Sequence, residues 1–386
     1  MATVAEPTAI MDEISINPPK RLLYGPGPGQ VHPRVYQAMA QPIVGHLDAY
    51  FFQISNEIQQ LLRKVFGTDN EMTFLISATG SGGMETAISN FVSPGTKVAS
   101  FGNGYFCDRQ AEMARRHGGN VVRLEKPWGE VFSDQEAAEF IRLEKPQVVT
   151  YVQAETSSGA FQKGEAICKA AHEVGALVIA DCVTSLGAMP VEIDKTGIDI
   201  AYSCSQKGLS CPPGLAPLTV SPRALEHLKT RTTPNSSWYF DISLIADYLV
   251  HSHRYHHTAS ATMFYALREG LALIDEEGLE KRWERHHKAH LEFVKKVEAL
   301  GLEMHVPSPA NRIWNLNTVK VPQGVDDAKV RATLLKENGI EIAGGFGPLA
   351  GKIFRVGLMG PLATTESVNH FMHCFASALR GAGYKA

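Results

Sequence analysis

The chain has 386 residues, enough for two domains, and its 44% hydrophobic and 20% charged residues are typical of a water-soluble globular protein. A formal net charge of −3 excludes a broad electrostatic attraction to nucleic acid or to an anionic membrane, and no apolar stretch is long enough to span a bilayer. Six cysteines without a CxxC pair favour a reducing, cytoplasmic compartment. The first twenty residues lack the basic and apolar regions of a secretory signal, so we expect none.

The chain begins with a predicted N-terminal arm over residues 1–20, which has no clear periodicity and ends in Pro18 and Pro19. From residue 21 to 277 we predict a large α/β domain, because short apolar runs alternate with longer amphipathic patterns. The runs are apolar throughout, as expected of strands that helices cover on both faces of a mostly parallel sheet. The seven predicted strands cover residues 73–77, 97–101, 121–124, 147–152, 176–181, 199–203 and 216–220.

Two of the intervening helices carry recognisable end signals. Ser133 and Glu136 form a capping-box pattern at the start of one predicted helix. Gly175 closes another predicted helix, at the C-terminal position where helices favour glycine. The composition changes after about residue 275, where a charged stretch with an apolar stripe, 276–301, predicts a long helix. It leads into a smaller α+β domain, which we place at residues 278–386.

Polar and small residues follow the first predicted strand. Ligands of open α/β sheets bind beyond the carboxyl ends of the strands, so these positions matter for function. Thr79, Gly80 and Ser81 lead into a helical pattern, and helix-start N–H groups with nearby hydroxyls bind phosphate. The stretch is neither a P-loop nor a complete dinucleotide fingerprint, since Glu85 replaces the last glycine. A plain connector remains an alternative.

Three further strand ends carry candidate side chains. The aromatic residues Tyr105 and Phe106 can belong to the core or can stack on a flat cofactor. The hydroxyls of residues 153–159 can contact a ligand or close a turn. Asp181 ends an apolar strand, where a carboxylate either caps a helix or keeps a ring nitrogen protonated. The residues alone leave each of these alternatives open.

Lys207 is the most informative residue, in the run DIAYSCSQKGLSCPPG, and no charged residue lies near it between Asp199 and Arg223. It is either an ordinary loop lysine or a partly desolvated amine, whose pKa is lowered and which is free for covalent chemistry. The order of phosphate cup, aromatic lid, hydroxyl turn, acid and lysine is what a pyridoxal-phosphate site requires. Such a site needs a Schiff-base lysine, an acid partner for the pyridinium and a helix start for the phosphate.

With these residues in this order, the chain resembles the class V aminotransferases of the pyridoxal-phosphate fold type I group. Within the family it looks most similar to alanine–glyoxylate and serine–glyoxylate aminotransferases. The most specific part of the resemblance is ADCVTSLGAMP, followed at the family's spacing by DIAYSCSQKGLSCPPG. It implies a type I fold, bound pyridoxal 5'-phosphate, a homodimer with shared active sites, and small amino acids and 2-oxo acids as substrates.

The resemblance also implies roles for single residues. Lys207 matches the Schiff-base lysine, which also shuttles the substrate proton, and Asp181 matches the pyridinium partner. Phe106 falls at the position of the stacking aromatic, and Arg355 matches the arginine that binds the substrate carboxylate, a role that suits a guanidinium. The other matches are the cofactor-binding residues Thr79, Gly80, Ser81, Thr156, Val183 and Gln206, the residues Tyr255 and Thr258 that reach the neighbouring subunit's phosphate, and Gly45 at the substrate pocket.

The implied activity is a ping-pong transamination from alanine or serine to glyoxylate, giving glycine and pyruvate or hydroxypyruvate. The residues do not rank alanine against serine as the donor. Pyridoxamine–pyruvate and ureidoglycine–glyoxylate types belong to the same family and stay open as alternatives, as does pyruvate as the acceptor.

Other classes of function fit the residues less well. A cysteine desulfurase needs a histidine before the reactive lysine, where this chain has Gln206, and a mobile cysteine, whereas Cys374 lies in a helical pattern. A nicotinamide-dependent oxidoreductase needs a glycine fingerprint followed by an acid, which we do not find. The histidines of residues 251–257 are crowded and lack an evident carboxylate partner, so we expect no metal site there.

Overall fold

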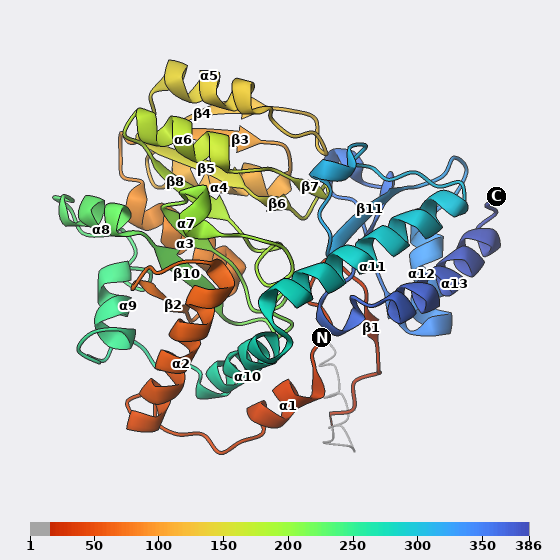
Figure 1. The fold of residues 1–386 in the computed structure, drawn as a ribbon, viewed down its shortest axis with the longest axis horizontal. Coiled ribbons are helices and arrows are strands. Elements are labelled where there is room, and N and C mark those ends of the chain that lie inside the picture. Colours follow the sequence, from red (N-terminus) through yellow and green to blue (C-terminus); the bar gives the residue numbers. More distant parts are fainter. Residues whose placement is uncertain (1–15, 386) are drawn as a thin grey trace, which may run out of the picture.

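A seven-stranded sheet forms the centre of the larger part of the molecule in the computed structural model, which describes residues 16–385 (Figure 1). Its order is β2-β10-β9-β8-β5-β3-β4. Strand β10 runs antiparallel to both of its neighbours, and the remaining pairs are parallel. The prediction of a mostly parallel seven-stranded sheet is therefore confirmed. The strands are β2 (Thr73–Ile76), β3 (Lys97–Gly102), β4 (Asn120–Glu125), β5 (Val148–Val152), β8 (Leu177–Asp181), β9 (Ile200–Tyr202) and β10 (Ala216–Val220).

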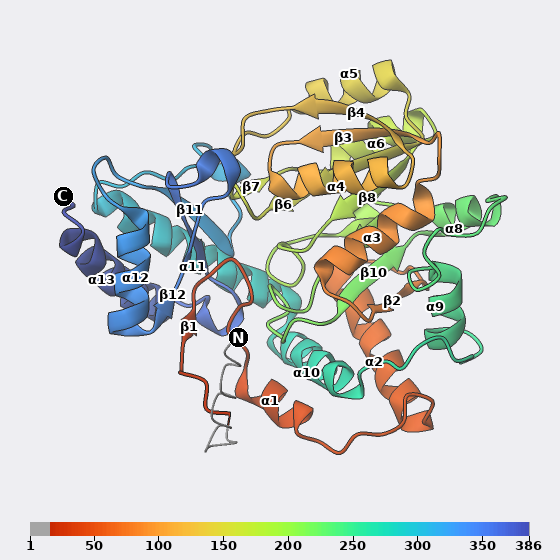
Figure 2. The ribbon, with the colours of Figure 1, turned by 180° about the vertical axis from the view of Figure 1, so that it is seen from behind.

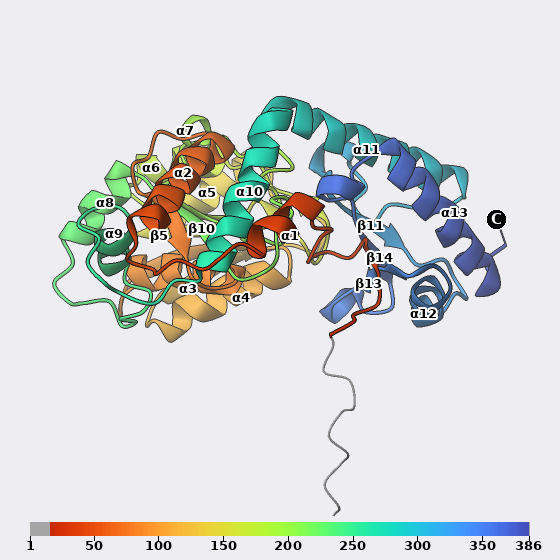
Figure 3. The same ribbon diagram turned by 90° about the horizontal axis from the view of Figure 1, so that it is seen from below.

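Helices cover both faces of this sheet, which explains why its central strands are apolar throughout. Helices α3 (Gly80–Phe91) and α4 (Tyr105–Arg116) lie on one face, and α5 (Asp134–Glu144) and α6 (Glu165–Glu173) lie on the other (Figures 2 and 3). Strand β4 differs from the prediction of a strand buried on both faces, because it forms the edge of the sheet and its residues are partly exposed.

The end signals predicted for two of these helices are confirmed. Ser133 and Glu136 form the capping box of α5, with both reciprocal hydrogen bonds present. Helix α6 ends at Glu173 with Val174 as its C-cap, and Gly175 follows with a φ of +81°, a conformation that glycine adopts without steric cost.

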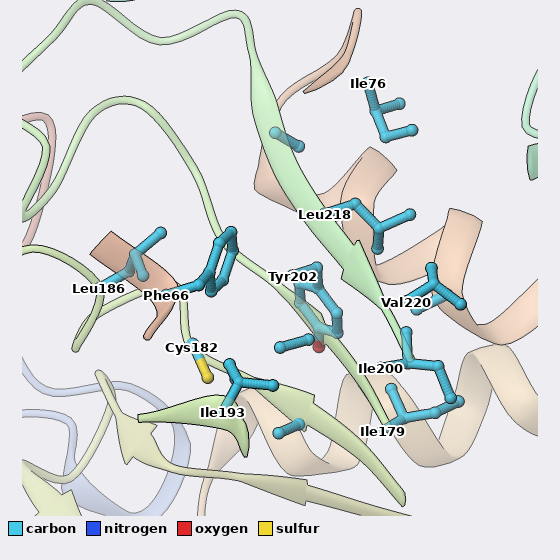
Figure 4. Packing of buried hydrophobic residues seen from close by; sticks show 14 of the residues in the cluster. Phe66, Ile76, Ile179, Cys182, Leu186, Ile193, Ile200, Tyr202, Leu218 and Val220 are labelled. Carbon is cyan, nitrogen blue, oxygen red and sulfur yellow. The ribbon is translucent and has the colours of Figure 1, made fainter. Parts of the chain in front are cut away.

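The remaining helices of the larger part pack around this sheet and its hydrophobic core. Figure 4 shows a section of that core, in which Tyr202 of β9 and Leu218 of β10 lie among Phe66 and Cys182. Burying one such large apolar side chain stabilises the fold by roughly 1.5–3 kcal/mol. These helices are α1 (Pro33–Met39), α2 (Ala49–Phe66), α7 (Ile193–Thr196), α8 (Pro222–Lys229), α9 (Ile242–Leu249) and α10 (Ala261–Glu277).

The C-terminal part, at the blue end of the chain in Figure 1, has a second hydrophobic core of its own. The predicted long charged helix begins only at Leu279, because Gly278 has a φ of +85° and separates it from α10. A small antiparallel sheet in the order β11-β14-β13 packs with the helices. The elements are α11 (Leu279–Ala299), β11 (Leu316–Lys320), α12 (Asp327–Asn338), β12 (Ile340–Glu341), β13 (Ala343–Gly344), β14 (Ile353–Gly357) and α13 (Thr365–Gly381).

The first described strand, β1 (Leu22–Leu23), joins this C-terminal part rather than the central sheet. It pairs in parallel with β12, and Tyr24 lies in the second core and donates a hydrogen bond to the Ser367 carbonyl over 3.0 Å. The division into residues 21–277 and 278–386 stays a prediction. Most of the predicted arm, residues 1–15, lies outside the described residues. In the described part of the chain, no helix combines the length and apolar character needed to cross a membrane.

Candidate active site

A cavity of about 220 Å³ lies where several strands of the central sheet end. Strands β2, β3, β5, β8 and β9 all point the same way, so their carboxyl ends meet at one edge of the sheet. The cavity brings together most of the residues predicted from the sequence: Thr79, Gly80, Ser81, Phe106, Thr156, Asp181, Val183, Gln206, Lys207 and Arg355. Residues far apart in the chain thus share one small space, as the strand-end argument predicted.

The Lys207 side chain is buried in this cavity, with 7% of its surface exposed. Its Nζ donates hydrogen bonds to Thr156 Oγ1 over 2.7 Å and to Thr184 Oγ1 over 3.1 Å. Burial lowers the pKa of this amine from 10.5 to about 8. Gly27, with a φ of +118°, lies against the lysine stem, where a Cβ would come within 3.1 Å of Lys207 Cγ. These features favour a reactive amine over an ordinary loop lysine.

Asp181, the last residue of β8, is 2% exposed and accepts two hydrogen bonds. Val183 N–H donates to Oδ1 over 2.8 Å, and Tyr202 O–H donates to Oδ2 over 2.9 Å. Turns rather than a helix follow Asp181, so it does not cap a helix. Burial raises the pKa of the carboxyl from 3.8 to about 6, although both hydrogen bonds and the charge of Lys207 oppose that rise.

The start of α3 provides the polar end of the cavity. Thr79 is the N-cap residue and makes no capping hydrogen bond with its side chain. Gly80 is packed so closely that a Cβ would lie 3.0 Å from Cys204 Cβ. Gln206 Oε1 is buried and has no hydrogen-bond partner among the described residues. This end of the cavity therefore offers the free N–H groups of a helix start, which suit an anion.

The sequence analysis missed two charged residues at this site, Glu155 and Arg109. The Glu155 carboxylate is fully buried and accepts hydrogen bonds from the N–H groups of Phe106 over 3.1 Å and Cys107 over 3.2 Å, so it caps α4. A Cβ on Gly104 would collide with Glu155, so this position requires glycine. The Arg109 guanidinium lies 4.9 Å from the Phe106 ring centre and donates to Ser81 Oγ over 2.7 Å. Both residues hold predicted site residues in place.

Arg355 of β14 brings a guanidinium from the C-terminal part to the cavity, and it is 3% exposed. Its Nε donates to the Gly344 carbonyl over 2.7 Å, and the Phe346 ring lies 3.9 Å from the guanidinium carbon. Burial lowers the pKa of Arg355 to about 10, so it stays cationic at neutral pH. A desolvated, oriented guanidinium of this kind binds carboxylates well.

Three predicted site residues, Gly45, Tyr255 and Thr258, do not line this cavity. Tyr255 is 56% exposed, its hydroxyl is 3.5 Å from Thr258 Oγ1, and its ring centre is 5.2 Å from that of His46. The three residues therefore lie near one another, apart from the cavity of their own chain. The predicted role of Tyr255 and Thr258 at a neighbouring subunit's site stays a prediction, as does that of Gly45 at the substrate pocket.

The crowded histidines of residues 251–257 contact several different partners, and His256 Nδ1 lies 2.8 Å from His257 Nδ1. His253 stacks on Phe52 with ring centres 3.8 Å apart, and His257 Nε2 lies 2.6 Å from Ser77 Oγ. Between residues 16 and 385, no three or more histidine, cysteine or acidic side chains are grouped as a metal site would need. Cys374 is buried in α13 within the second core, which does not suit the mobile nucleophile of a cysteine desulfurase.

Comparison with known proteins identifies the family. The family model described as "Aminotransferase class-V" matches residues 29–360. Over 380 residues, 98% of this chain and 91% of the relative, the sequence is 37% identical to alanine–glyoxylate aminotransferase of Callithrix jacchus. The chain belongs to the class V aminotransferases. The crystal structure of alanine–glyoxylate aminotransferase from Nostoc sp. has a TM-score of 0.95 and 44% identity, covering 98% of this chain and 100% of that one.

A second type of activity occurs among equally similar relatives of this class V aminotransferase. The (S)-ureidoglycine–glyoxylate transaminase of Bacillus subtilis is 37% identical over 368 residues, which cover 91% of this chain and 88% of that protein. The solved relatives have the pyridoxal-phosphate type I fold, so the predicted fold class is confirmed.

As a class V aminotransferase the protein is a transaminase that depends on pyridoxal 5'-phosphate, and its cavity fits this cofactor. The cavity contains the kinds of group that the cofactor requires, namely the amine of Lys207, the buried carboxyl of Asp181 and the aromatic ring of Phe106. The uncapped start of α3 remains for the phosphate, and Gln206 lines the same cavity.

The raised pKa of Asp181 predicts that ionisation of this carboxyl destabilises the cofactor-free fold. Because the buried carboxyl holds its proton more tightly than it does in the unfolded chain, ionising it costs stability as pH rises from about 4 to 6. The stability of cofactor-free Asp181→Asn relative to the wild type should increase by on the order of 2 kcal/mol between pH 4.5 and pH 7.5, because only the wild type ionises at this position. Thermal unfolding at the two pH values measures this. A stability difference between the two proteins that does not change with pH would contradict the raised pKa of Asp181.

Proposed function

We propose that this transaminase moves the amino group of alanine or serine to glyoxylate in a ping-pong cycle, with two subunits completing each site. The observation that carries the proposal is the meeting of a buried amine, a buried carboxylate and a buried guanidinium in one cavity of about 220 Å³. The names of the similar relatives support glyoxylate as the acceptor, since they share it.

Lys207 and Asp181 perform the proton chemistry in this proposal. Pyridoxal phosphate, when bound, supplies an electron sink for charge that develops at the substrate α-carbon. Asp181 keeps the ring nitrogen protonated by placing a negative charge beside it. Lys207 Nζ removes the proton from the substrate α-carbon and delivers it again, since a pKa of about 8 leaves part of the amine unprotonated near neutral pH.

Arg355 binds both substrates in turn through the carboxylate that they share. A ping-pong cycle needs one anchor for the amino acid and for the oxo acid, because they occupy the site one after the other. The guanidinium is buried and is held by the Gly344 carbonyl and the Phe346 ring, so it is oriented before a substrate arrives. This orientation lowers the entropic cost of binding.

The dimer contributes Gly45, Tyr255 and Thr258 to the partner's site. Their absence from the cavity of their own chain and the exposure of Tyr255 support this part of the proposal. The cytoplasm is the proposed compartment, since all six cysteines are free thiols and such thiols persist in a reducing environment.

The absorbance spectrum of the purified enzyme with bound cofactor tests which amino acid serves as the amino donor. We expect a visible band at about 410–430 nm that moves towards the ultraviolet when alanine or serine is added, and that returns with glyoxylate. Ureidoglycine and pyridoxamine are added separately as rival donors, and Lys207→Ala serves as the control that cannot complete turnover. A response to a rival donor alone, with none to alanine or serine, would overturn the proposed donor.

Substitution of Arg355 tests the carboxylate anchor. Arg355→Ala should raise KM for the amino acid and for glyoxylate by about thirtyfold or more, since a buried charge pair is lost, while the cofactor band stays unchanged. Arg355→Lys keeps the charge, and its KM should lie between those of the wild type and Arg355→Ala, because an ammonium cannot form the paired hydrogen bonds that a guanidinium makes to a carboxylate. Steady-state kinetics with both substrates measures the effect, and an unchanged KM in Arg355→Ala would exclude this role.

A further inference from the structure

The Thr184 hydroxyl touches the reactive amine, although no sequence signal singled it out. Thr184 lies in the turn after β8, three residues beyond Asp181, and its side chain is fully buried. Lys207 Nζ donates to Thr184 Oγ1 over 3.1 Å and to Thr156 Oγ1 over 2.7 Å. The two threonine hydroxyls are also hydrogen-bonded to each other. Two hydroxyls that are hydrogen-bonded to each other therefore both accept hydrogen bonds from the Lys207 amine.

The backbone at Thr184 is held by a hydrogen bond from a buried residue of the C-terminal part. Asn315 is fully buried, and its Nδ2 donates to the Thr184 carbonyl over 2.8 Å. The main-chain carbonyl of Asn315 in turn accepts a hydrogen bond from Leu358 N–H over 3.0 Å, next to strand β14. The neighbouring Ser185 Oγ donates to Gln153 Oε1 over 2.5 Å. These contacts fix the backbone at Thr184 independently of Lys207.

The carboxylates near Lys207 are occupied by other donors. Asp181 accepts from Val183 and Tyr202, and Glu155 accepts from the start of α4 and from Ser157. The ion pairs found within residues 16–385 do not include Lys207. Cys204 and Arg355 are the other titratable groups that influence the amine. The two hydroxyls are therefore the hydrogen-bonding partners of this buried amine.

A transaminase needs such partners, because its lysine is released and recaptured in every half-reaction. A buried amine without an acceptor is costly to maintain and free to rotate away from the substrate. We propose that Thr184 is a positioning residue that holds the Lys207 amine within reach of the substrate whenever the amine is not bonded to the cofactor. This inference rests on the proposed role of Lys207. Thr156 is expected beside the cofactor ring, which leaves Thr184 as the acceptor dedicated to the lysine.

The first test measures Lys207 in cofactor-free protein, without any turnover. The pH dependence of acetylation at Lys207, followed by mass spectrometry, reports the pKa of its amine, which in the wild type lies at about 8. Thr184→Val removes the acceptor and should lower this midpoint by about one pH unit, since one hydrogen bond to a charged group is worth about tenfold in the protonation equilibrium. Thr184→Ser should restore the wild-type midpoint. Thr184→Ala is the second variant, should valine not be accommodated.

The second test measures the half-reaction with the amino donor. Thr184→Val should slow it about tenfold and leave KM within about twofold, and Thr184→Ser should recover most of the rate. Thr219→Val is the matched control, because Thr219 forms a similar buried hydroxyl pair with Thr73 over 2.8 Å and does not line the cavity. It should change neither the acetylation midpoint nor the rate.

The outcomes separate this inference from the proposed function. A Thr184→Val protein with the wild-type midpoint and the wild-type rate would overturn the role of Thr184 and leave the transaminase proposal intact. A wild-type protein in which Lys207 carries no cofactor would overturn both. A loss of rate that Thr184→Ser does not recover would also contradict the inference, since it would show that the threonine methyl group, not the hydroxyl, matters.

Discussion

The removal of the Lys207 amine from water is the constraint on which the rest of the site depends. A lysine in water is protonated at neutral pH and cannot act as a nucleophile or base. Here burial brings its pKa to about 8, and Gly27 permits the chain to close over the lysine stem. The loop is tied down as well, because Gly29 N–H donates to the Gln206 carbonyl over 2.8 Å. The reactivity of one side chain therefore depends on packing contributed by several segments.

The same dry cavity shifts the acid and the base in opposite directions. Desolvation disfavours charge on both Asp181 and Lys207, so the pKa of the acid rises and that of the amine falls towards neutrality. Hydrogen bonds from Val183 and Tyr202 limit the rise at Asp181 and keep it available as an anion once a cationic ring is bound. The lowered pKa of Lys207 suits this amine to proton transfer near pH 7, whereas Asp181 serves as the charged partner of the ring.

The central sheet and the centre of the site could be predicted from the sequence, because both depend on local patterns. Apolar runs indicated the seven strands, and the position of Asp181 and Lys207 directly after such runs placed them at one edge of the sheet. The antiparallel direction of β10, the exposed edge strand β4 and the pairing of β1 with β12 had no local signal. These features depend on which segments meet in space.

Three residues of the site could not be predicted from the sequence for the same reason, because their roles depend on contacts between distant segments. Glu155 acts on the start of α4, Arg109 on Ser81, and Thr184 on Lys207, and each contact joins segments that are distant in sequence. A buried glutamate in a hydroxyl-rich turn or a threonine in an apolar stretch looks like an ordinary turn or core residue. Only the three-dimensional arrangement shows that these side chains orient the groups that perform the chemistry.

Locating the cofactor's covalent attachment tests the central claim most directly. The holoenzyme is reduced with borohydride, which fixes the cofactor to the lysine that carries it, then digested and analysed by mass spectrometry. We predict a cofactor-derived mass on the peptide that contains Lys207 and on no other lysine peptide. Attachment at another lysine, with the Lys207 peptide unmodified, would contradict the account of this site.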